Sequence, residues 1–103
     1  MTDARRRAAA YPALRAFCRA YLHEDALTEY GSAPAAARAF RADASPGERR
    51  AVAVEWRRFI ADGDGPAASV AARLRAVLGA TTVPATEAEV VALGRALAPV
   101  NRR

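Results

Sequence analysis

The feature that most constrains this sequence is the helical spacing of its large apolar residues, which stand in a background rich in alanine. Leu14, Phe17, Cys18, Tyr21 and Leu22 recur at steps of three and four residues, which places them on one face of a helix. Alanine is the strongest helix former, and arginine and leucine also favour helix. Strand-like alternation of β-branched residues is nearly absent. The sequence therefore predicts an all-α fold.

Helix starts are marked most clearly at Ser45, where Ser45, Pro46 and Glu48 have the spacing of a capping box. The helix that follows carries Val52, Trp56, Phe59 and Ile60 on its apolar stripe and ends at Asp62–Pro66. A second capping box is predicted at Thr86–Glu89, ahead of a last helix that Pro99 stops. A further helix is expected after Ser32, which caps it, with Ala37 and Phe40 facing inward. Another is expected to end at Gly79 and to carry Val70, Leu74, Val77 and Leu78. Leu27 and Tyr30 are expected to anchor the segment before Gly31 in the core.

The length of 103 residues fits one domain. We expect a compact bundle of about five short helices over residues 11–101, preceded by a basic, flexible arm over residues 1–10. The connections are short, so consecutive helices are expected to pack as neighbours. No exposed heptad seam is visible, and a monomer is expected.

The net charge of +5 lies mainly at the two ends of the chain, and every cationic side chain is arginine. Five of the 16 arginines are Arg5 to Arg7, Arg102 and Arg103. The remaining 11 face 10 acidic residues in 8–101, which leaves that body at +1. Such ends are usually solvated, although a basic tail can also bind phosphate backbones by releasing counterions.

The residues that enzymes and metal sites require are scarce. Cys18 is the only cysteine and is interpreted as a small buried hydrophobe; the alternative is a nucleophile paired with His23, the only histidine. Asp62 and Asp64 flank Gly63, a pattern more typical of a helix stop than of a cation loop. We therefore expect no enzymatic activity, no cofactor and no metal. No membrane span or signal-peptide core is visible, so a cytoplasmic protein is expected.

A series of short motifs runs from Tyr11 to Glu48: Tyr11-Pro-Ala-Leu, Tyr21-Leu-His-Glu-Asp25, Glu29-Tyr-Gly-Ser32 and Ser45-Pro46 with Glu48. Their order and spacing are similar to those of small CdiI-type immunity proteins of contact-dependent growth inhibition systems. The position after Asp25, often aromatic in that family, is Ala26 here. Beyond Glu48 the likeness lies only in the pattern of helices and breaks.

The resemblance implies a protein that binds and neutralises the C-terminal domain of a cognate toxin. Such toxins are often nucleases with basic clefts, for which an acidic patch with aromatic anchors is a suitable complement. The candidate contact residues in this sequence are Tyr21, His23, Glu24, Asp25, Glu29 and Tyr30. The two tyrosines could instead be core residues whose hydroxyls reach the surface.

The alternative function is a small, basic nucleic-acid-binding module. Its support is the arginine-rich ends and the arginines of the helix after Ser45, namely Arg49, Arg50, Arg57 and Arg58. No helix-turn-helix signature accompanies them, and few polar side chains on that helix could read bases.

Overall fold

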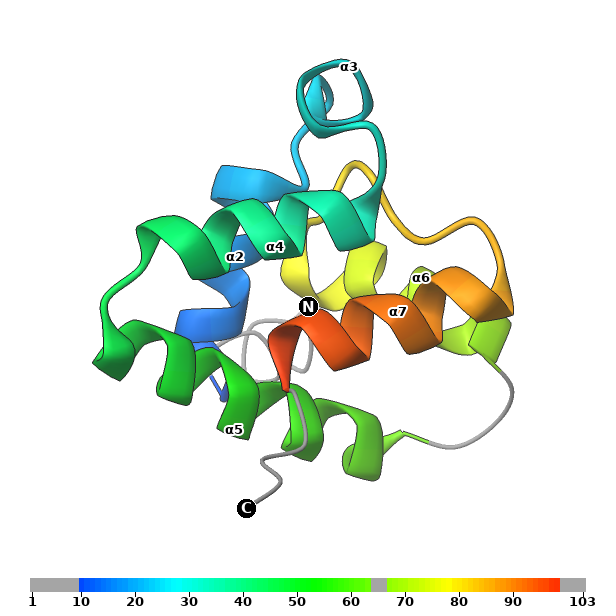
Figure 1. Cartoon of the computed structure of the whole chain (residues 1–103). Helices are drawn as coiled ribbons and strands as arrows, with labels where there is room; N and C mark the ends of the chain where they lie inside the picture. The colour runs from blue at the N-terminus through cyan, green and yellow to red at the C-terminus, as the bar shows by residue number, and fades with distance from the viewer. Residues whose placement is uncertain (1–9, 64–66, 99–103) are drawn as a thin grey trace.

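The computed structural model describes residues 10–63 and 67–98, and within these ranges the chain is helical and contains no strand (Figure 1). The helices are α2 (Pro12–Tyr21), α3 (Ala26–Tyr30), α4 (Ala33–Asp43), α5 (Pro46–Asp62), α6 (Ala67–Leu78) and α7 (Glu87–Leu97). The predicted all-α bundle is confirmed, and the short α3 is an addition to it. The predicted arm over residues 1–10 lies, apart from Ala10, outside the described residues. Within the described part of the chain, no helix has both the length and the apolarity needed to cross a membrane.

The helix starts follow the side chains that cap them. At α5 the capping box is complete: the Glu48 N–H donates to Ser45 Oγ at 3.1 Å, and the Ser45 N–H donates to Glu48 Oε1 at 2.8 Å. At α7 the predicted box is only half formed. Thr86 Oγ1 accepts from the Glu89 N–H, but the Glu89 carboxylate accepts from the N–H of Ala85 rather than that of Thr86. The cap is still effective, because the Glu89 N–H in the first turn and the Ala85 N–H before the helix both find acceptors.

Helix ends are set by backbone conformation. α6 ends at Gly79, whose φ of +72° lies in the left-handed region that favours glycine. The Ala80 N–H then donates back to the Leu74 carbonyl at 3.2 Å, as in a Schellman motif. α5 ends at Asp62, as predicted, whereas Asp64–Pro66 and the predicted stop at Pro99 lie outside the described residues.

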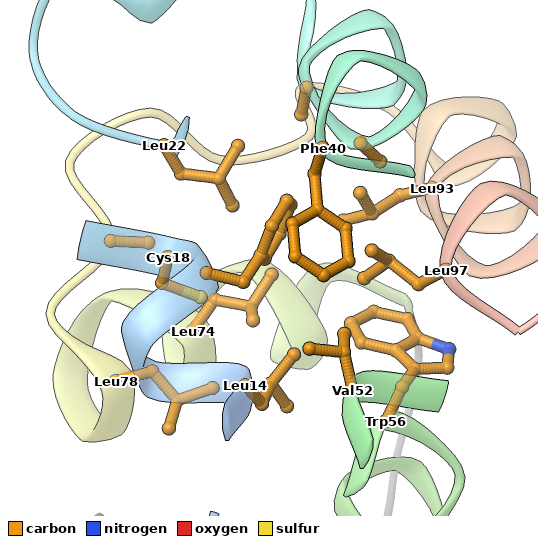
Figure 2. Close-up of a cluster of buried hydrophobic side chains, with 14 of the residues drawn as sticks. Leu14, Cys18, Leu22, Phe40, Val52, Trp56, Leu74, Leu78, Leu93 and Leu97 are labelled. Atoms are coloured by element: carbon orange, nitrogen blue, oxygen red, sulfur yellow. The ribbon is translucent and has the colours of Figure 1, made fainter. Parts of the chain in front are cut away.

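The apolar stripes meet in one core (Figure 2). Most of the predicted stripe residues are buried, and Cys18 lies among them with no exposed surface. Three predictions are wrong: Leu27 is 58% exposed, Ile60 is 37% exposed, and Val91, predicted among the apolar positions of the last helix, is 47% exposed. α3 is a single short turn that buries Ala26 and so points Leu27 outward, while Ile60 lies one residue past the fully buried Phe59, about 100° around α5. The buried side chains come from every helix and from the link after α6: Tyr11, Leu14, Phe17, Cys18, Leu22, Ala26, Ala33, Ala36, Ala37, Phe40, Val52, Ala53, Trp56, Phe59, Leu74, Leu78, Ala80, Leu93 and Leu97.

The packing order differs from the chain order. The most extensive contact joins α4 to α7, which lie side by side in Figure 1, and α2 packs against α4, α5 and α6. The expectation that consecutive helices pack as neighbours holds for α3 with α4 and for α6 with α7. α5 packs mainly against α2 and α7, and it meets α6 through Arg73, whose guanidinium donates to the Phe59 carbonyl at 2.6 Å. A short connection brings together only the ends of two helices. The crossing of their axes depends on which apolar stripes can be buried against each other.

Candidate functional site

The two candidate tyrosines belong to a stack of aromatic rings at the junction of α2, α3 and α4. Tyr21, the last residue of α2, stacks between Phe17 and Tyr30 with ring centroids 5.8 Å apart on both sides. It also meets the edge of Phe40 at 5.6 Å. Phe17 and Phe40 are buried, whereas Tyr21 and Tyr30 are half-buried. The stack therefore leads from the core to the surface and fixes the orientation of both tyrosines.

His23 lies in the connection between α2 and α3 and contacts Asp25, at the start of α3, and Glu29, near its end. Its Nδ1 accepts a hydrogen bond from the Asp25 N–H at 3.1 Å, and its Nε2 lies 3.4 Å from Glu29 Oε1. Its ring centroid is 6.4 Å from that of Tyr30. Because Nδ1 accepts, the neutral ring carries its proton on Nε2, directed at the Glu29 carboxylate.

The carboxylates of the candidate set lie on the solvent side of this cluster. Glu24, Asp25 and Glu29 are all exposed. Asp25 occupies the N-cap of α3, but its side chain makes no capping hydrogen bond. The structure therefore brings Tyr21, His23, Glu29 and Tyr30 into contact, with Glu24 and Asp25 adjacent to them in the same connection. We call these six residues, together with the exposed Leu27, the acidic-aromatic face.

The connection that carries this face is held by the segment between α6 and α7. The N–H groups of Thr81 and Thr82 both donate to the Leu22 carbonyl, at 2.8 and 2.9 Å, and Thr82 Oγ1 donates to the His23 carbonyl at 2.8 Å. Thr82 is buried. The sequence offered no signal for this support, since the partners are about 60 residues apart and are joined through backbone carbonyls.

A groove adjoins the acidic-aromatic face between α2, α4 and α5, with a volume of about 540 Å³. Tyr21 belongs to both, because its ring lines the groove and its hydroxyl donates to Asp43 Oδ2 at 3.3 Å. Asp43 and Glu48 also line the groove. The sequence predicts only a capping role for Glu48 and no site role for Asp43, so the structure adds two carboxylates beside the predicted site.

Burial and neighbouring carboxylates act on the tyrosine hydroxyls in the same direction. Burial raises the pKa of Tyr21 above its ordinary value, and the Asp43 carboxylate raises that pKa further. Burial likewise raises the pKa of Tyr30, with the Glu29 carboxylate as the next cause. Both hydroxyls therefore remain protonated hydrogen-bond donors at neutral pH.

Cys18 is unsuited to nucleophilic chemistry. Complete burial raises the pKa of its thiol to about 12, because the apolar core disfavours the thiolate. Cys18 is fully buried, and the polar partners of the His23 ring are Asp25 and Glu29, so the structure does not bring the thiol and the imidazole together; the interpretation of Cys18 as a core residue is confirmed.

Two of the four arginines of α5 serve the fold. Arg49 donates to the Arg41 carbonyl at 3.0 Å, and Arg58 donates to the Ala10 carbonyl at 2.6 Å. The Arg58 guanidinium also lies 5.4 Å from the ring centroid of Tyr11. Arg50 and Arg57 are exposed.

Comparison with known protein families assigns the chain to one of them. Residues 10–90 match the family described as CdiI immunity protein. The chain belongs to this family. The match includes the whole acidic-aromatic face and extends past Glu48, where the motif resemblance stopped, to the first turn of α7. The chain is thus an immunity protein of the contact-dependent growth inhibition class. Neither the curated proteins nor the solved structures provided a significant match.

Proposed function

We propose that this immunity protein neutralises the C-terminal domain of its cognate toxin by binding it through the acidic-aromatic face. The observation that carries the proposal is a stacked pair of tyrosines with Glu29 beside His23, in a connection that also exposes Glu24, Asp25 and Leu27. The proposed contact residues are Tyr21, His23, Glu24, Asp25, Leu27, Glu29 and Tyr30.

Each part of the face has a distinct physical role in this proposal. Exposed carboxylates attract a basic partner over distances comparable to the Debye length and raise the association rate. Aromatic rings already held by packing supply contact area without losing rotamer freedom on binding. Leu27, at 58% exposure, offers apolar surface whose burial would stabilise a complex.

The direct test is calorimetric titration of the protein with the C-terminal domain of the toxin encoded beside its gene, followed by growth rescue of cells that express that domain. We expect a 1:1 complex and rescue. Absence of both binding and rescue would refute the proposed function.

The surface is tested by variants with a matched control. Leu27→Ala is expected to weaken toxin binding by about tenfold, because it removes exposed apolar area from the proposed contact. Val54→Ala removes a similar exposed side chain from α5, where Val54 is 45% exposed, and is expected to leave binding unchanged. Equal effects of the two substitutions would contradict this assignment of the surface.

Nucleic-acid binding is the second candidate, and the observation that favours it is the exposure of Arg50 and Arg57 on α5. These two arginines are seven positions apart, about two helical turns, which puts both on one side of the helix. Affinity for duplex DNA that falls steeply with added salt would support this function. No binding at low salt would remove it.

A further inference from the structure

The groove between α2, α4 and α5 is lined by small residues and by aromatic ones. The small residues are Ala13, Ala16 and Ala20 of α2 with Gly47 and Ala51 of α5, and they are exposed or half-buried. The alanines of α2 follow the helical repeat, so the absence of larger side chains along one strip creates the hollow. The aromatic lining consists of the rings of Phe17, Tyr21 and Phe40, of which Phe17 and Phe40 are buried. A volume of about 540 Å³ lies in the range of about 300–1,000 Å³ that is typical of ligand pockets.

Two carboxylates line this apolar groove, and within the described residues neither lies within 4 Å of a cationic nitrogen. Asp43 accepts from the Tyr21 hydroxyl at 3.3 Å, and Glu48 accepts from the Ser45 N–H at 2.8 Å. Arg49 is next to Glu48 in the sequence, but its guanidinium donates to the Arg41 carbonyl instead. In a chain with 16 arginines, the two groove carboxylates are left without an ion pair in the part that the structure describes.

We propose that this groove receives an arginine side chain of the toxin, a second contact beside the acidic-aromatic face. A guanidinium stacks on aromatic rings and pairs with carboxylates, and the groove offers both. An anion would meet two like charges there, and a purely apolar group would bury the carboxylates without compensating them. The groove is continuous with the acidic-aromatic face through Tyr21, so one toxin domain can contact both. This inference rests on the proposed function, since the occupant is the toxin.

The first test removes the groove charges and keeps their hydrogen bonds. In Asp43→Asn with Glu48→Gln, the amide oxygens can still accept from Tyr21 and Ser45, so the capping box persists. The matched control, Glu87→Gln with Glu89→Gln, removes the same charge from the start of α7, outside the groove. Asp43 and Glu48 are exposed, so each pair with an incoming guanidinium is worth up to about 1 kcal/mol, and we expect the groove variant to weaken binding of the adjacent toxin's C-terminal domain by about tenfold. The control should change binding by less than about threefold.

The second test fills the groove. Ala16→Leu places a larger side chain at an exposed position of the groove lining and is expected to weaken toxin binding at least about tenfold, because the incoming side chain would clash. Ala76→Leu makes the same exchange at an exposed position of α6 and should leave binding unchanged.

The outcomes separate the two proposals. If the unaltered protein does not bind the toxin, the proposed function and the groove assignment both fail. If it binds, and both groove variants bind equally well, only the groove assignment is overturned. The alternative occupant of the groove is a second copy of this chain. The groove assignment would also be overturned if sedimentation showed self-association that Ala16→Leu abolished while toxin affinity stayed unchanged.

Discussion

Replacement of Glu55 by alanine tests how α2 and α5, two of the three helices around the groove, are held together. Glu55 is a buried residue of α5 with 8% exposure, and its Oε1 accepts from the Leu14 N–H at 2.8 Å. Leu14 is the third residue of α2, so this N–H has no partner within its own helix. The N-cap residue Tyr11 makes no side-chain cap. Glu55 therefore caps α2 from a different helix.

The expected loss of stability in Glu55→Ala has two causes. Glu55→Ala leaves the Leu14 N–H buried without a partner, which costs about 1–3 kcal/mol. It also removes a negative charge from the positive end of the α2 dipole, which adds about 0.3–1 kcal/mol. The expected loss in the free energy of unfolding is thus about 1–4 kcal/mol, which for a domain of this size lowers Tm by roughly 5–30 °C.

Urea unfolding followed by circular dichroism measures this loss directly. Glu55→Gln keeps an acceptor for the Leu14 N–H and should lose only about 1 kcal/mol. Glu24→Ala removes an exposed carboxylate and should stay within about 0.5 kcal/mol of the unaltered protein. A loss below about 1 kcal/mol for Glu55→Ala, or equal losses for the alanine and glutamine variants, would refute the reasoning.

Three further predictions concern stability. The folded-state pKa of Cys18, about 12, lies above its ordinary value of 9.0, so the unfolded chain loses this proton first as pH rises. The free energy of unfolding should therefore fall between these two pH values, with Cys18 contributing about 1.4 kcal/mol per pH unit. Urea unfolding should show a shallower fall for Cys18→Ala. Gly79→Ala should destabilise by about 1 kcal/mol, because a left-handed φ strains alanine although the space is open, whereas Gly47→Ala, inside α5, should stabilise by about 0.5–1 kcal/mol; the same sign for both in thermal melts would contradict this. Thr82→Val removes the hydroxyl donor to the His23 carbonyl and should cost about 1 kcal/mol and speed hydrogen exchange around His23, whereas unchanged exchange would show that this bond does not hold the connection.

The sequence by itself determined the helices and most of their buried stripes. Helical propensity and capping act within a few residues, so Ser45 with Glu48, Ser32 and Gly79 marked boundaries that the structure confirms. The motifs around Tyr21 and Tyr30 also indicated the family. The same local signals were weakest where a helix is shortest, and α3 with its exposed Leu27 was missed for that reason.

The tertiary structure alone decided which helices meet and what their meeting creates. The contact between α4 and α7, the cap that Glu55 provides for Leu14 and the anchoring of His23 by Thr82 join residues about 40 or more positions apart. No local pattern encodes these pairs, because each depends on how several apolar stripes are buried at once. The groove has the same origin: its alanines, rings and carboxylates belong to three helices, and their approach brings Asp43 and Glu48 beside Tyr21.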